Sequence, residues 1–173
     1  MVIEDSSHVT ASCTATVVRP MRAQEAAEVS RFVLAAFDEF MAKDFDDWGK
    51  AGFAKFASPE ALLARQAYGY LTLVAEVEGR LAGLIQVRWP SHIVALFVRK
   101  ECQGRGIGRA LVTEAVRRIE MECPEAEFVT VVSSPHAVGF YQRLGFETVY
   151  ADGARGAEHG MRLPLTSAAD PEH

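Results

Sequence analysis

The segment Ile93–Gly108 constrains the fold of this chain most, because an apolar run leads there directly into three closely spaced glycines. The six apolar residues that open the segment are enough for a buried strand. After the glycines, apolar residues return at three- and four-residue spacing on one helical face: Ile107, Leu111, Ala115 and Ile119. The segment therefore predicts a strand, a glycine loop and a helix in immediate succession.

The glycine loop is predicted to bind an anion. Gly104, Gly106 and Gly108 let several main-chain N–H groups converge at the positive end of the following helix, which suits a phosphate or pyrophosphate. A plain turn is the alternative, but four flanking cations favour the anion site: Arg99, Lys100, Arg105 and Arg109. The loop is not a P-loop, since no Lys-Ser or Lys-Thr pair follows it, and its glycine spacing fails the dinucleotide-binding pattern.

Length and composition limit the classes of function. The chain has 173 residues and fits one domain, expected over 14–165 with loose tails at 1–13 and 166–173. A net charge of −5 argues against nucleic acid as the main partner, and no apolar run approaches the roughly 20 residues of a membrane helix. No secretory signal is visible, and three scattered cysteines fit neither a disulfide framework nor a zinc site. A cytoplasmic protein without a metal or a membrane partner is expected.

Hydrophobic periodicity and turn residues predict alternating elements along the chain. Asp38–Ala57 interleaves acids with aromatics and is read either as a short amphipathic helix or as the acidic wall of a site for a cationic amine. Because a helix precedes the strand at 128–132, that strand is expected to run parallel to the one before it. The expected strands are 14–19, 70–77, 81–88, 92–99, 128–132, 146–151 and 158–165, and the expected helices are about 23–41, 59–68, 107–122 and 136–144.

Two motifs carry a resemblance to a known family. Gln103–Gly108 reads Q-x-x-G-x-G directly after a strand, and it resembles the acetyl-coenzyme A loop of the GNAT superfamily of N-acetyltransferases. Ala137–Phe146 is similar to the A-x-x-F-Y-x-x-x-G-F signature of the same family. The resemblance covers about Thr14 to Leu165. It implies an α+β fold with a mixed, mostly antiparallel sheet of about seven strands, about four flanking helices, and a splay between the fourth and fifth strands.

The resemblance also implies roles for single residues. Main-chain groups around Leu96–Val98 would pair with the pantetheine arm, the amides of Gln103–Gly108 would hold the pyrophosphate, and Tyr141 would be the general acid. Many relatives carry Asn where this chain has Ser134, which is either a weakened coenzyme contact or the N-cap of its helix. The implied coenzyme-binding residues are Leu96, Phe97, Val98, Gln103, Gly104, Arg105, Gly106, Ile107, Gly108, Arg109, Ser134, Ala137 and Tyr141.

The general base has three candidates. His92 opens the strand before the loop, titrates near neutrality, and would share a face with Val94, Leu96 and Val98 by strand alternation. Glu76 on a neighbouring strand and a water chain are the other two.

The implied reaction is transfer of an acetyl group from acetyl-CoA to a small amine or a protein amino group. A coenzyme-binding sensor or pseudoenzyme without transfer is the alternative, and a longer acyl donor is a third reading. A homodimer is compatible with the resemblance, because dimers are common among relatives.

Overall fold

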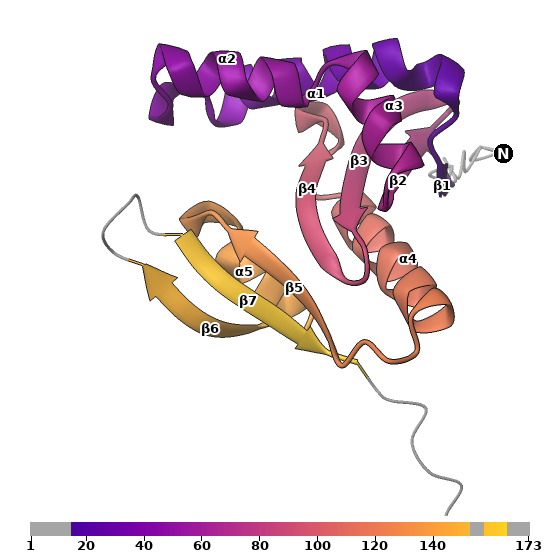
Figure 1. Ribbon diagram of the computed structural model, residues 1–173, viewed down its shortest axis with the longest axis vertical. Helices are drawn as coiled ribbons and strands as arrows, with labels where there is room; N and C mark the ends of the chain where they lie inside the picture. Colours follow the sequence, from indigo (N-terminus) through magenta and orange to yellow (C-terminus); the bar gives the residue numbers. More distant parts are fainter. Residues whose placement is uncertain (1–14, 153–157, 166–173) are drawn as a thin grey trace, which may run out of the picture.

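The computed structural model describes residues 15–152 and 158–165, so the predicted tails and the loop at 153–157 lie outside the described residues. Seven strands form one mixed sheet in the order β1-β2-β3-β4-β5-β7-β6 (Figure 1). The strands are β1 (Thr16–Pro20), β2 (Tyr70–Val77), β3 (Arg80–Arg88), β4 (His92–Val98), β5 (Phe128–Ser133), β6 (Glu147–Asp152) and β7 (Glu158–Pro164). The α-helices are α1 (Ala26–Phe40), α2 (Asp47–Phe56), α3 (Pro59–Ala67), α4 (Ile107–Glu122) and α5 (Val138–Arg143).

The helices cover the two faces of the sheet separately. The buried side chains of α1 and α3 pack with those of β2 and β3 into one core on one face. Those of α4 and α5 pack on the other face into a second, larger core that also receives β5 and β7. In Figure 1, α1, α2 and α3 lie together at one end, while α4 runs beside the sheet.

The helices exceed the predicted number by one, because the segment between α1 and α3 forms its own helix. Asp46 begins α2 by accepting a hydrogen bond from the Gly49 N–H at 2.7 Å. This cap confirms the prediction of a short amphipathic helix there. The predicted start of α3 is also confirmed, since the Ser58 hydroxyl accepts from the Ala61 N–H at 3.2 Å and Pro59 follows it.

The sheet opens between β4 and β5. These strands are parallel, as predicted, but only His92 with Thr130 and Ile93 with Val131 are paired. Beyond these pairs β4 continues to Val98 and β5 to Ser133 without contacting each other as a ladder. The two strands therefore splay toward their carboxyl ends, where the glycine loop follows β4 (Figure 1).

A β-bulge in β4 reverses the predicted alternation of its side chains. Gln86 pairs with Ala95 while Val87 pairs with Ile93, so Val94 is an extra residue in the strand. Ile93 consequently packs in the α4 core together with Leu96, three positions later. The prediction that His92 shares a face with Leu96 and Val98 is wrong, because the bulge places His92 on the face that α1, α2 and α3 cover.

Candidate active site

The loop after β4 is built by two tight conformations. A 3-10 turn at Lys100–Cys102 leads into Gln103, whose N–H donates to the Lys100 carbonyl at 3.1 Å. Gly104 and Gly106 then have φ values of 74° and 79°, in the left-handed region that disfavours any side chain. Because these left-handed residues are two positions apart, successive amides of the loop turn toward one side, as in an anion-binding nest.

Five successive amides of this loop are free of protein acceptors. Within the described residues, the N–H groups from Gly104 to Gly108 have no hydrogen-bond partner. They stand at the amino end of α4, a helix of 16 residues, where the helix dipole adds positive potential. The Gln103 amide was predicted to belong to this set, but its bond to Lys100 removes it.

The edge of β4 that faces the splay is also unpaired. The Arg99 N–H donates to the Ala82 carbonyl at 2.8 Å, so residues 97 and 99 direct their main-chain groups toward β3. Leu96 and Val98 direct theirs toward the opening. In agreement, the Gln103 side-chain amide reaches the Val98 carbonyl at 3.2 Å. Of the three residues predicted to pair with a pantetheine arm, Leu96 therefore presents free edge groups, while Val98 presents its N–H and its carbonyl is bonded to Gln103.

Phe97 differs from its two neighbours. Its main-chain groups face β3. Its ring lies on the sheet face opposite to the side chains of Leu96 and Val98, with its centroid 6.2 Å from that of Phe53 on α2. Phe97 therefore lines the α2 side of β4 rather than the free edge.

Tyr141 lies in α5 with its ring in the larger core. The residue is 5% exposed, and its ring meets those of Phe140 and Phe146 edge-on at centroid distances of 5.1 and 5.2 Å. Burial raises the pKa of the Tyr141 hydroxyl above its ordinary value. The hydroxyl is therefore protonated at neutral pH and can serve as a proton donor.

Gly108 brings the loop and the tyrosine helix together, a role that the sequence analysis missed. A β-carbon at Gly108 would lie 3.1 Å from the ring of Phe140, the residue before Tyr141. The first turn of α4 can approach α5 this closely only because Gly108 has no side chain. The sequence signal for this contact was the third glycine of the motif. The spacing of the three glycines had attributed Gly108 to anion binding only.

His92 occupies the closed end of the splay. Its Nδ1 lies 2.8 Å from the Thr130 hydroxyl, and burial, together with the nearby charge of Arg88, lowers the pKa of the imidazole. Leu96 lies four positions after His92 along β4, a separation of at most about 13 Å. His92 and Tyr141 thus lie on opposite faces of the sheet.

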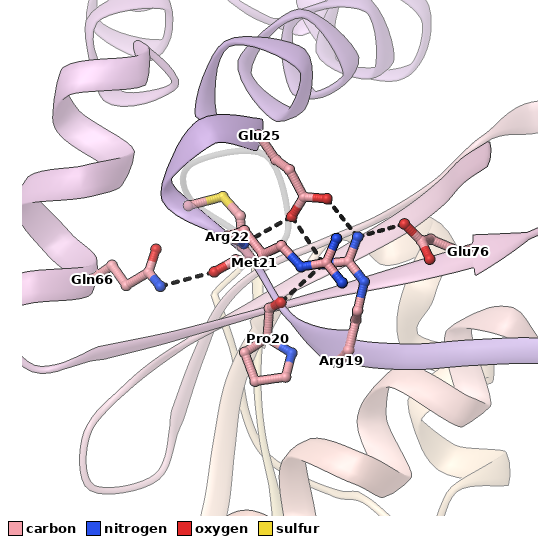
Figure 2. Close-up of polar contacts among 7 residues, drawn as sticks. All are labelled: Arg19, Pro20, Met21, Arg22, Glu25, Gln66 and Glu76. Carbon is pink, nitrogen blue, oxygen red and sulfur yellow. Dashed lines mark hydrogen bonds and ion pairs between the residues drawn. The ribbon is translucent and has the colours of Figure 1, made fainter. Parts of the chain in front are cut away.

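Figure 2 shows Glu76 in an ion cluster with Arg19 and Glu25. Glu76 lies on β2, which β3 separates from the splayed strand β4. Arg19 on β1 donates to Glu76 on β2 and, at 2.5 and 2.8 Å, to both carboxylate oxygens of Glu25. The cluster lines a cavity of about 150 Å³ beside α1. Hydrogen bonds from Arg19, and a further one from the Arg22 N–H, lower the pKa of Glu25 to about 2.

The remaining predicted site residues lie around the loop. Arg105 and Arg109 are exposed and belong to no ion pair within the described residues. Ser134 stands at an N-cap position, but its side chain makes no capping hydrogen bond, so the capping interpretation is not supported. Ala137 packs against the larger core.

The acidic segment before α2 is largely engaged in structure. Asp46 caps α2, and Glu39 pairs with Lys100 at 2.7 Å, which ties the end of α1 to the turn after β4. An acidic wall for a cationic amine is therefore reduced to the exposed Asp38, Asp44 and Asp47.

Neither a metal cluster nor a spanning helix is found in the described residues. No group of three His, Cys, Asp or Glu side chains there could hold a metal ion. In the same residues, no helix has the length and apolar character that crossing a membrane requires.

Comparisons with known proteins agree with this architecture. A family model described as an acetyltransferase (GNAT) domain matches residues 41–163. An uncharacterised N-acetyltransferase of Methanocaldococcus jannaschii is 35% identical over 79 residues, which cover 42% of this chain and 50% of that protein. An acetyltransferase of Pectobacterium atrosepticum is 30% identical over 83 residues, which cover 46% of this chain and 59% of that protein. The matched segments thus span about half the length of these curated relatives.

A solved structure gives the same fold. The PaiA N-acetyltransferase of Thermoplasma acidophilum, determined in complex with coenzyme A, has a TM-score of 0.75 at 16% identity, with 87% of this chain and 99% of that chain covered. The family model spans both sequence motifs, and the splayed seven-stranded sheet matches in topology. This chain belongs to the GNAT acetyltransferase family.

Proposed function

We propose that the protein transfers an acetyl group from acetyl-CoA to the amine of a small molecule or a protein. The observation that carries this proposal is the row of five free amides from Gly104 to Gly108, directly after an unpaired strand edge. The coenzyme of the solved PaiA structure supports acetyl-CoA as the donor. The edge groups of Leu96 and the Val98 N–H would hold the pantetheine arm as an added strand would be held.

The loop amides would neutralise the pyrophosphate, and Arg105 and Arg109 are the nearby cations for the adenosine phosphates. This arrangement needs no metal. It would fix the thioester at the opening of the splay, where a main-chain N–H of β4 can stabilise the oxyanion of the tetrahedral intermediate.

Tyr141 is proposed as the general acid that protonates the departing thiolate. The hydroxyl has no hydrogen-bond partner within the described residues, and burial of the residue raises its pKa, so the group carries its proton at neutral pH. Phe140 and Phe146 hold the ring in place from two sides.

His92 is proposed as the base for the attacking ammonium, acting through a chain of waters because of its distance along β4. Its lowered pKa leaves the imidazole neutral and able to accept a proton near pH 7. Base and acid lie on opposite faces of the sheet, which suits an amine that attacks from one side of the thioester while the thiolate leaves on the other. Glu76 is a weaker candidate, since accepting a proton would break its bond to Arg19.

A sensor that binds acetyl-CoA without transfer is the second candidate function. The free amides serve a sensor equally well, and the lack of an asparagine at Ser134 favours it. A buried tyrosine placed next to the loop through Gly108 favours transfer.

A cytoplasmic location is part of the proposal. Two of the described cysteines are unpaired, and thiols are kept reduced in the cytoplasm.

The test measures thiol release from acetyl-CoA across a panel of amines, together with acetyl-CoA binding by calorimetry. Transfer with the wild type, lost by about 10²–10⁴-fold in Tyr141→Phe with unchanged binding, is expected. Tyr68→Phe is the matched control, since Tyr68 is 83% exposed and lies outside the site. Binding without transfer to any amine establishes the sensor, and absence of binding refutes both candidates.

A further inference from the structure

Arg65 is a half-buried cation that has no counter-ion among the residues that the structure describes. It lies in the last turn of α3, and its Nε donates to Gln86 Oε1 at 2.9 Å. Its Nη2 is buried and has no hydrogen-bond partner in the described part of the chain. No carboxylate among the described residues pairs with it, and burial lowers the pKa of the guanidinium.

The other half-buried arginines of the fold are treated differently. Arg19 is paired with Glu25 and Glu76, and Arg118 is paired with Glu114 at 2.8 Å. Removing a guanidinium from water without an anion is unfavourable, and a buried donor left unbonded adds to that cost. An unmatched arginine of this kind is therefore explained by a partner that the fold itself does not contain.

The Arg65 guanidinium is held rigidly. Its carbon lies 3.8 Å above the ring of Phe56, which fixes the plane of the group by stacking. Gln86, which accepts the Nε hydrogen bond, is 1% exposed and donates in turn to the Thr72 hydroxyl at 2.9 Å. The position of the remaining donors is thus set before any ligand arrives, which lowers the entropic cost of binding.

The place of Arg65 connects it to the proposed site. Gln86 pairs with Ala95 of β4, on the face of the sheet that also carries His92 and Phe97. Phe56 follows Phe53 by one helical turn of α2, and Phe53 contacts Phe97. Arg65 therefore lies on the face of the sheet that α1, α2 and α3 cover. This is the face that carries His92, the proposed base for the amine.

We propose that Arg65 binds the carboxylate of the acceptor, so that the preferred acceptor is a small amine that also carries a carboxylate. This inference rests on the proposed function. The Nη1 of Arg65 has no hydrogen-bond partner in the described residues and is not one of their buried unpartnered atoms, so Nη1 is the donor that a carboxylate oxygen can reach.

The experiment compares free amino acids with the corresponding amino acid amides, which differ by the carboxylate charge. For the wild type, kcat/KM is expected to be about 10- to 100-fold higher for the acid than for the amide, the range of a hydrogen bond to a charged group. Arg65→Gln, which retains a donor for Gln86, should reduce this ratio to about 1, and Arg65→Lys should give an intermediate ratio. Arg118→Gln, on the opposite face, should leave it unchanged.

A second measurement needs no turnover. Calorimetric titration of the preferred amino acid into the protein saturated with coenzyme A should give binding that Arg65→Gln weakens by the same factor, with the affinity for coenzyme A unchanged. An acid-to-amide ratio near 1 in the wild type, or a ratio that Arg65→Gln and Arg65→Lys both preserve, overturns the inference while transfer itself stands. Absence of transfer to every amine, with no amino acid bound beside coenzyme A, overturns it together with the proposed enzyme.

Discussion

Gly108 and Phe140 are in direct contact across the interface between α4 and α5, with only 3.1 Å between a β-carbon placed on the glycine and the ring. This contact sets the separation between the anion-binding loop and the helix that carries Tyr141. The loop and the helix of the proposed acid are therefore in contact, although Phe140 lies 32 positions after Gly108 in the sequence.

Gly108→Ala should displace Phe140 and with it the Tyr141 hydroxyl. Overpacking at this contact is expected to cost about 1–3 kcal/mol in the free energy of unfolding and to lower kcat more than the affinity for acetyl-CoA. Urea denaturation and steady-state kinetics measure the two effects. Gly52→Ala is the control, because nothing lies within 4 Å of its β-carbon, and it should leave kcat unchanged.

Gly104→Ala tests the anion loop through its backbone. A side chain at φ 74° is unfavourable by about 1–2 kcal/mol, so the loop should leave its nest conformation and the acetyl-CoA dissociation constant should rise at least tenfold. Gly69→Ala has a similar φ of 85° and equally open surroundings, but it lies before β2. If both variants lose stability equally and neither loses acetyl-CoA affinity, the loop does not bind the coenzyme.

The pH dependence of transfer should show a low acidic limb that belongs to His92. Because burial lowers its pKa below the ordinary value of 6.5, the ring should stay neutral, and the rate high, until the pH falls below about 6.5. His92→Gln should slow transfer and abolish this limb in a profile of kcat/KM against pH. A limb that persists in His92→Gln would assign the titration to another group.

The same histidine should affect folding. Its folded pKa is lower than its unfolded pKa, so the unfolded state binds more protons, and stability should decrease as the pH falls below about 6.5. The urea midpoint of wild type and His92→Gln, measured at pH 7 and pH 5, gives the size of the difference.

Glu25 should contribute stability that acid removes. Its pKa of about 2 lies below the ordinary 4.5, so the contribution is complete above pH 4.5 and is lost as the pH falls toward 2. Glu25→Gln should reduce the free energy of unfolding at pH 7 by about 1–3 kcal/mol, the range of hydrogen bonds to a charged group. The exposed Glu120 provides the control, and Glu120→Gln should match the wild type in urea denaturation at both pH 7 and pH 3.

Local chemistry made most of the elements predictable. The Ser58-Pro59 start of α3, the apolar runs of β2 and β3, and the helix after the glycine loop appear within a few residues of their predicted bounds, since capping groups and side-chain periodicity act over a single turn or strand. The parallel pairing of β4 and β5 followed from the intervening helix.

The bulge at Val94 was not predictable in this way, because it depends on how β3 pairs with β4 and not on the residue itself. It reversed the face of His92, and with it the relation between the proposed base and Tyr141.

The sequence by itself determined the glycine loop, the strand before it and the tyrosine helix, because each is a pattern of neighbouring residues with its own backbone preference. Only the tertiary structure decided which amides remain free, which face His92 occupies, and that Gly108 abuts Phe140. It also decided that Arg65 has no counter-ion within the described part of the chain. These properties depend on partners far away in the chain, and such partners are chosen by the packing of the whole sheet and its helices.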